Sequence, residues 1–104
     1  MRETWQALYD LNADVIVNGH EHVYERFDPQ DANGNPDPAR GMRQFTVGTG
    51  GASLSGFVTP KRNSVARIIY WGVARFTLME GSYRWEFIPI DAGGSTDFGT
   101  GQCH

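Results

Sequence analysis

Two long β-forming runs on either side of a two-residue turn constrain this fold more than any other feature of the chain. Residues 67–79 and 82–90 are rich in aromatic and β-branched side chains, and Glu80-Gly81 separates them. A glycine at this place suits the tight turn of a hairpin, so the pattern predicts two antiparallel strands. Along the second run every other side chain is a large aromatic one, which predicts one apolar face. These aromatic residues are Tyr83, Trp85 and Phe87.

The first half of the chain predicts one helix and two short strands. Residues 2–12 carry apolar side chains at helical spacing, so they predict an amphipathic helix. The run Val15-Ile16-Val17 is β-branched, as buried strands commonly are. Residues 44–47 alternate as a second strand and lead into Gly48-Thr49-Gly50-Gly51, where a close approach of the backbone or a positive φ is expected.

Three further segments are rich in glycine, proline or polar residues. They predict an exposed loop at 28–41, a mobile connection at 52–66 and an irregular tail at 91–104. At 104 residues the chain is long enough for one small domain. We therefore expect a single α+β domain over residues 1–104, in which the N-terminal helix packs on a small, mainly antiparallel sheet.

Charge and composition exclude several classes of protein. The formal net charge of −3 and the pI near 5.5 argue against binding to nucleic acid. No apolar stretch is as long as a membrane-spanning helix, and residues 1–10 carry charges where a secretory signal has its apolar segment. The single cysteine, Cys103, cannot form a disulfide within the chain. We expect no nucleic-acid partner, no membrane association and no targeting segment, and the sequence names no compartment.

Two of the three histidines lie together directly after the first predicted strand, in the segment Asn18-Gly19-His20-Glu21-His22. If the backbone stays extended past Gly19, His20 and His22 point to the same side, because side chains alternate along a strand. Two neutral imidazoles side by side can chelate one metal ion or give one ligand to each of two neighbouring ions. The segment therefore predicts a metal-binding turn at the rim of the sheet.

The segment from Asn18 to Phe27 resembles the last metal-binding motif of calcineurin-like metallophosphoesterases, in their purple acid phosphatase-like branch. That motif reads Gly-His-x-His followed closely by Tyr-Glu-Arg. Residues 47–52 resemble the strand and glycine turn of the same branch, and residues 82–87 resemble its terminal hairpin. The residues that match the motif are Gly19, His20, His22, Tyr24, Glu25 and Arg26.

The resemblance covers only the C-terminal third or so of such an enzyme. The family's earlier motifs, including the aspartate that bridges two metals, do not occur in this chain, whereas residues 96–104 resemble the natural end of bacterial members. In the family the first histidine of the motif binds one metal and the second binds the other, which assigns these roles to His20 and His22. The resemblance thus implies a truncated C-terminal domain, one half of a layered sandwich.

This resemblance implies metal-dependent hydrolysis of phosphoesters, with activated phosphodiesters as the expected substrates and metal-activated water as the nucleophile. The expected cofactor is a divalent ion, zinc or manganese first, with iron as another option. Arg26 would orient the phosphate and Tyr24 would pack beside the metal turn. These two are the candidate catalytic residues.

The source of a third metal ligand stays open at this point. It could come from a second copy of the chain or from the same copy, where the candidates are His104, Cys103, Asn18, Glu25, Asp28 and Asp97. We favour a second copy, in a homodimer or higher homo-oligomer, and name His104 as a candidate metal residue beside His20 and His22. A half-sandwich exposes the apolar sheet face that its missing half would cover, and such a face drives association.

Simpler interpretations remain beside this one. The two histidines could be polar residues of an ordinary turn, and Arg26 and Glu25 could form a structural ion pair. The chain could also be a metal-binding remnant without turnover, or a fragment of a larger phosphoesterase.

Overall fold

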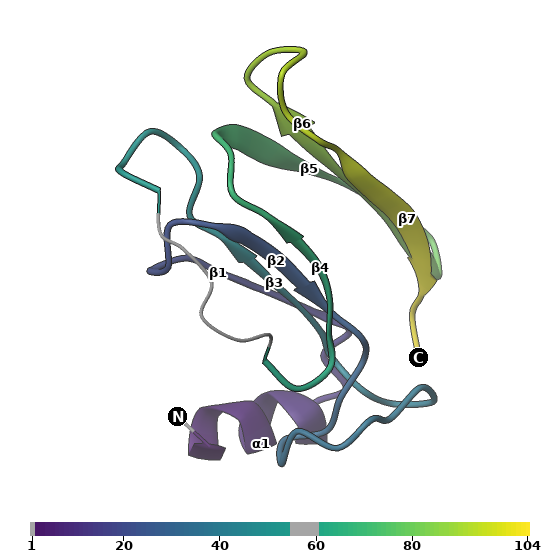
Figure 1. Ribbon diagram of the computed structural model, residues 1–104. Coiled ribbons are helices and arrows are strands. Elements are labelled where there is room, and N and C mark those ends of the chain that lie inside the picture. Colours follow the sequence, from purple (N-terminus) through teal and green to yellow (C-terminus); the bar gives the residue numbers. More distant parts are fainter. Residues whose placement is uncertain (1, 55–60) are drawn as a thin grey trace.

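The computed structural model describes residues 2–54 and 61–104, which form one short helix and two β-sheets (Figure 1). The first sheet has the strand order β1-β3-β2-β4 and the second has the order β5-β6-β7. The elements are α1 (Arg2–Asp10), β1 (Val15–Asn18), β2 (Tyr24–Phe27), β3 (Arg43–Val47), β4 (Ser64–Ile68), β5 (Gly72–Met79), β6 (Ser82–Pro89) and β7 (Asp97–Gln102). Among the described strands, β1 and β3 pair in parallel and the other pairs are antiparallel.

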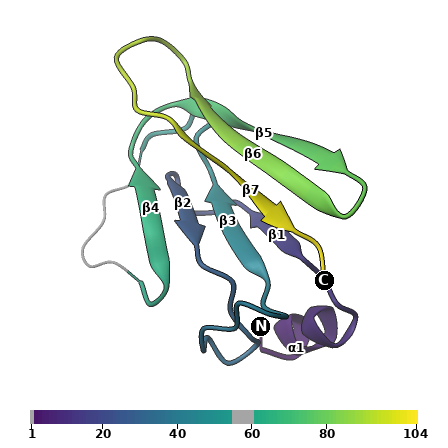
Figure 2. The same cartoon turned by 90° about the vertical axis from the view of Figure 1, so that its right-hand side faces the viewer.

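The predicted α+β architecture is wrong, because the second sheet, and not the helix, covers the first sheet. Figures 1 and 2 show the two sheets face to face, with α1 beyond one end of the strands. The helix has 9 residues and buries none of them. It instead contacts the loop after β2, where Tyr9 donates a hydrogen bond of 2.6 Å to Asp37 and Arg2 donates one of 2.7 Å to Asn33. Each sheet already has an apolar face for the other, so the fold needs no helical layer.

The core lies between the two sheets and is mostly aromatic. The rings of Phe45 and Trp85 are 5.4 Å apart, and those of Tyr24 and Phe87 are 4.7 Å apart, each pair joining one sheet to the other. Aromatic pairs at such distances add to the free energy that burial itself provides. The buried cluster consists of Tyr24, Phe45, Ile68, Tyr83, Trp85 and Phe87. The predicted apolar face of the second hairpin strand is therefore confirmed.

The predicted hairpin is confirmed from Gly72 onward, where β5 pairs with β6 around a turn at Gly81 with φ of 73°. The predicted first strand was too long, because residues 67–68 end β4 in the other sheet and residues 69–71 cross between the sheets. A β-rich composition does not reveal where a chain changes sheets. Gly72 marks the place, since a Cβ there would lie 2.4 Å from the carbonyl oxygen of Ile88.

The predicted irregular tail is wrong, because residues 97–102 form β7 along β6. Two glycines explain why a sequence poor in β-formers becomes a strand. A Cβ at Gly99 would lie 2.4 Å from the ring of Trp85, and one at Gly101 would lie 2.3 Å from the ring of Tyr83. The large aromatic rings of β6 thus occupy the space that side chains of β7 would need.

The remaining predictions have mixed outcomes. The helix, the strand over residues 44–47 and the turn-rich loop over residues 28–41 are confirmed. The strand after Asp14 exists but is an edge strand, half-buried, with Val17 52% exposed. Of the predicted mobile connection, residues 64–66 belong to β4, and residues 55–60 lie outside the described part. Within the residues that the structure describes, no helix is long and apolar enough to cross a membrane.

Candidate metal-binding turn

The histidine turn and the glycine turn lie against each other at one end of the strands of the first sheet. β1 and β3 are parallel, so the segments that follow them leave the sheet at the same end. The amide of Gly48 donates a hydrogen bond of 3.0 Å to the carbonyl of Val23. A Cβ at Gly48 would lie only 2.0 Å from the carbonyl oxygen of Glu21. Glycine at this position is therefore what allows the two turns to touch.

His20 is exposed on the outer face of the first sheet, at the end of β1. Its φ is 81°, so the backbone does not continue as an extended strand, and the predicted alternation of His20 and His22 does not apply. A non-glycine residue in this region carries backbone strain, which functional sites often retain. The exposed imidazole borders a hollow of about 400 Å³ on the outer face of the sheet. The hollow is lined by Asn18, Gly19, His20, Glu21, Gln44, Thr46 and Lys61.

His22 is half-buried and oriented by the loop after β3. Its Nδ1 lies 2.7 Å from the carbonyl oxygen of Ser53. A carbonyl oxygen only accepts, so Nδ1 carries the proton and the lone pair of the neutral ring is on Nε2. Metal-binding histidines typically donate their second ring N–H to such a carbonyl. The contact with Ser53 therefore orients the His22 ring in the way that such contacts orient histidine ligands.

Tyr24 and Arg26 face away from this hollow, into the space between the sheets. Both bind Asp97 of β7: the Tyr24 hydroxyl donates at 2.6 Å, and the Arg26 guanidinium donates at 2.8 and 3.1 Å. The guanidinium carbon also lies 5.0 Å from the ring centre of Trp85. The structure thus does not bring the two predicted catalytic residues to the histidine turn, and the partner of Arg26 is Asp97 and not Glu25.

Burial and hydrogen bonding shift the pKa values of this cluster. Burial, and then the hydrogen bond to Asp97, raise the pKa of Tyr24 well above its usual range. Burial acts to raise the pKa of Asp97, but the donors of Arg26 and Tyr24 outweigh it and hold the value below 3.8. Burial acts to lower the pKa of Arg26, yet the Asp97 carboxylate raises it overall. The cluster is therefore a stable ion pair that joins the two sheets.

His104 lies at the other end of β1 from the histidine turn. Its Nε2 is 3.3 Å from Asp14 and 3.1 Å from the carbonyl oxygen of Gly41. Asp14 precedes β1 and His20 follows it, and the four strand residues between them span about 13 Å. One copy of the chain therefore does not bring His104 to the same ion as His20. The neighbouring Cys103 is exposed at that same far end.

A metal ion fits this chain only in part. Among residues 2–54 and 61–104, no group of three or more His, Cys, Asp or Glu side chains is placed to hold an ion. The contact of His22 with Ser53 suits a ligand and His20 borders an open hollow, but His22 does not line that hollow. At least one further ligand has to come from outside the single chain.

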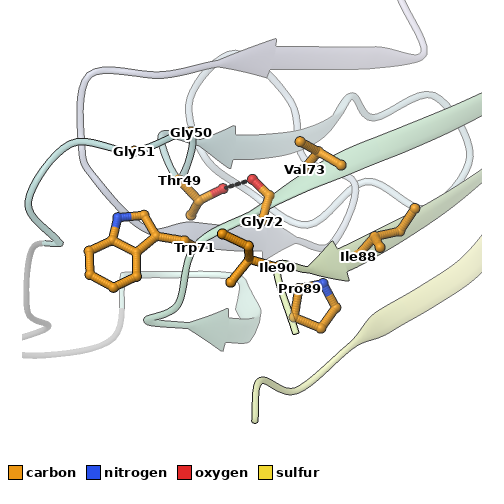
Figure 3. A pocket seen from close by; sticks show the side chains of 9 residues that line it. All are labelled: Thr49, Gly50, Gly51, Trp71, Gly72, Val73, Ile88, Pro89 and Ile90. Carbon is orange, nitrogen blue, oxygen red and sulfur yellow. Dashed lines mark hydrogen bonds between the residues drawn. The ribbon is translucent and has the colours of Figure 1, made fainter. Parts of the chain in front are cut away.

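The sequence did not indicate two other features of this region. Glu25 is fully buried, and its Oε2 accepts a hydrogen bond of 2.7 Å from Ser64 while its Oε1 has no partner among the described residues. The second feature is an uncharged hollow of about 440 Å³ beyond the glycine turn, with the Trp71 ring at one end (Figure 3). The indole donates to the carbonyl of Ala52, one residue before the carbonyl that holds His22.

Only the position of Trp71 just before a glycine could have suggested this hollow, because its other walls come from distant strands. The lining residues are Thr49, Gly50, Gly51, Trp71, Gly72, Val73, Ile88, Pro89 and Ile90.

Comparison of the chain with protein-family models, with curated proteins and with solved structures finds no match.

Proposed function

We propose that this protein hydrolyses phosphoesters, with activated phosphodiesters as the preferred substrates, in a metal-dependent reaction at the histidine turn. The observation that carries the proposal is the hydrogen bond of 2.7 Å between His22 Nδ1 and the carbonyl of Ser53. It fixes the ring and its tautomer in the way that metal-binding histidines require. The strained backbone of His20 supports the same site.

The residues around the turn suit the two parts of this chemistry. A divalent ion at His20 and His22, zinc or manganese with iron as another option, polarises a phosphoryl oxygen and lowers the pKa of water towards neutrality. Lys61 and Gln44 border the same hollow as His20 and offer N–H donors to phosphate oxygens. Arg26 is held by Asp97 between the sheets, whereas Lys61 borders the hollow, where its exposed ammonium lies 2.6 Å from Glu21 and can also turn to a phosphate.

The incomplete ligand set makes a homodimer part of the proposal. Two imidazoles leave an ion short of the three protein ligands that a catalytic zinc site usually has. A second copy is the nearest source of the missing ligand, and the small chain exposes several large apolar side chains that association could cover. The absence of a three-ligand group in the described residues favours a second candidate, a metal-binding protein without turnover.

Metal content and activity, measured on the same gel-filtration fractions, test the proposal. We expect zinc or manganese and the hydrolysis of bis(4-nitrophenyl) phosphate to elute together, in a fraction larger than one chain. The double variant His20→Ala, His22→Ala should lose both, while Lys61→Ala should keep the metal and lose activity. Full activity in the double variant would refute the proposal, and metal without turnover in the wild type would favour the second candidate.

A further inference from the structure

A polar cavity lies at the far end of β1 from the histidine turn, on the side of the first sheet that the second sheet covers. Its volume is about 380 Å³, which is within the range of small-molecule sites. Ionisable side chains from both sheets and from the end of the chain line it, namely Asp14, Arg43, Tyr83 and His104. None of them takes part in the chemistry proposed for the histidine turn.

Arg43 brings to this cavity a charge that the chain balances only weakly. Its side chain is 15% exposed, and its guanidinium carbon lies 4.7 Å from the ring centre of Trp85. Among the described residues it pairs with Asp28, which is 58% exposed and 4.0 Å away, beyond hydrogen-bonding distance. Arg26, on the same indole, has the Asp97 carboxylate at 2.8 Å. Arg43 therefore keeps N–H donors for a carboxylate from outside.

Tyr83 adds a hydroxyl donor beside this guanidinium. The residue is 4% exposed, and its hydroxyl accepts a hydrogen bond of 3.1 Å from Nε of Arg43. A phenol that accepts one bond still has its own proton to donate. Within residues 2–54 and 61–104 this proton has no acceptor. Arg43 and Tyr83 thus form a set of donors that suits one carboxylate group.

Asp14 brings the opposite charge to the same cavity. Its Oδ1 accepts a hydrogen bond of 2.9 Å from the amide of His104 and lies 3.3 Å from the imidazole of that residue. Neither group carries a fixed positive charge. In the part of the chain that the structure describes, no ion pair joins Asp14 to Arg43. Two opposite charges that share a cavity without pairing suit a ligand that carries both charges.

We propose that this cavity binds a free α-amino acid with a small apolar side chain. Arg43 and Tyr83 donate to its carboxylate, and Asp14 accepts from its ammonium group. The amide of Arg43 donates to the carbonyl of Asp14 at 2.9 Å, so the two charged side chains start from neighbouring backbone. An α-amino acid likewise carries its two charges close together, on one carbon and its carboxyl group.

The other parts of the wall favour an amino acid over a simpler ion. A carboxylic acid without an amine would leave Asp14 unmatched, and an amine without a carboxylate would leave Arg43 unmatched. The apolar lining residues have room only for a side chain without charge, and they are Pro29, Pro38 and Ala39.

Three probes that differ by one group each test this match. They are L-valine, isovalerate, which lacks the ammonium group, and isobutylamine, which lacks the carboxylate. Amide NMR spectra of the isotope-labelled protein, with EDTA in the buffer, give each dissociation constant without any metal at the histidine turn. We expect about 1 mM or tighter for L-valine, with shifts at Gly101 and His104, and at least tenfold weaker binding of the other two. No binding of L-valine, or equal binding of isovalerate, would overturn the proposal.

Tyr83→Phe tests the donor to the carboxylate, because it removes the hydroxyl and keeps the ring in the core. The affinity for L-valine should fall about tenfold. Tyr70→Phe is the matched control, since the Tyr70 hydroxyl binds Asp91 and neither residue lines this cavity. Arg43→Lys keeps the charge but loses the planar set of donors, and it should also weaken L-valine at least tenfold. Unchanged affinity in Tyr83→Phe and Arg43→Lys would overturn the carboxylate contact.

Asp14→Asn tests the contact with the ammonium group through a difference that general destabilisation does not produce. The variant should bind L-valine only as well as it binds isovalerate, while its affinity for isovalerate should not fall. Asp10→Asn, at an exposed carboxylate of α1, should keep the preference of the wild type for L-valine. The same preference in Asp14→Asn would overturn the role of Asp14.

Discussion

The space between the sheets and the histidine turn hold their polar side chains in opposite ways. Between the sheets, Asp97 receives three hydrogen bonds from Tyr24 and Arg26, and all three groups are partly or fully buried. At the turn, His20 is exposed, borders a hollow and has a strained backbone. The first set has its partners within the chain and contributes stability. The second leaves ligand positions to a group from outside, which is what binding requires.

The largest expected effect concerns the aromatic core between the two sheets. Phe45 is fully buried, and its ring lies 5.0 Å from Phe76 and 5.4 Å from Trp85. Phe45→Ala should lower the free energy of unfolding by about 3–5 kcal/mol, because it leaves a cavity. Urea denaturation measures the loss. Phe98→Ala, at a residue 72% exposed, should change it by no more than about 0.5 kcal/mol, and equal losses would contradict this account of the core.

The next effect separates stability from binding. Asp97→Asn removes the charge that Arg26 faces in a site where both side chains are less than one-fifth exposed. We expect the free energy of unfolding to fall by about 1–3 kcal/mol, since Arg26 keeps a buried charge without its full partner. Zinc content at the turn should not change. Asp28→Asn serves as the control, because Asp28 is exposed and 4.0 Å from Arg43, so its loss should be near zero.

Acid should weaken the same cluster. The pKa of Asp97 is lowered from 3.8 by its donors, so the folded state binds fewer protons than the unfolded state in this range. Its contribution is fully present above the unfolded-state pKa and disappears as the pH falls through the lower folded-state pKa. Urea midpoints between about pH 5 and pH 2 should therefore fall more steeply for the wild type than for Asp97→Asn. Parallel curves would show that Asp97 does not carry this dependence.

The smallest effect has the opposite sign and lies at the histidine turn. His20→Gly removes a Cβ from a backbone with φ of 81° and should stabilise the fold by about 0.5–1 kcal/mol. Zinc binding should fall at the same time. His20→Ala keeps the Cβ and therefore the strain, so it should lose zinc binding without gaining stability. A loss of stability in His20→Gly would show that the imidazole itself supports the turn.

The sequence predicted the elements of this fold better than their arrangement. The β5–β6 hairpin followed from local signals, because Gly81 and the alternating aromatic residues act on neighbouring residues. The crossing between sheets at residues 69–71 and the strand β7 did not. Both depend on contacts between distant segments, such as the ring of Trp85 over Gly99, and local propensity does not report these.

The candidate site was predictable in the same uneven way. The sequence pattern predicted a turn after the first strand, and the structure has this turn at the end of β1. It did not place Tyr24 and Arg26, whose direction depends on which face of β2 the second sheet covers. Nor did it show that His104 lies at the far end of β1, because the end of the chain reaches that place only through β7.

The bonds to Asp97 also have a kinetic consequence. They join residues that are 71 and 73 positions apart in the chain, so the chain between them has to be ordered before they form. Contacts of such separation are typical of β proteins that fold slowly. We expect these bonds to form after the rate-limiting step of folding, so their main kinetic effect is on the rate of unfolding. Asp97 should therefore slow unfolding and lengthen the lifetime of the folded two-sheet structure.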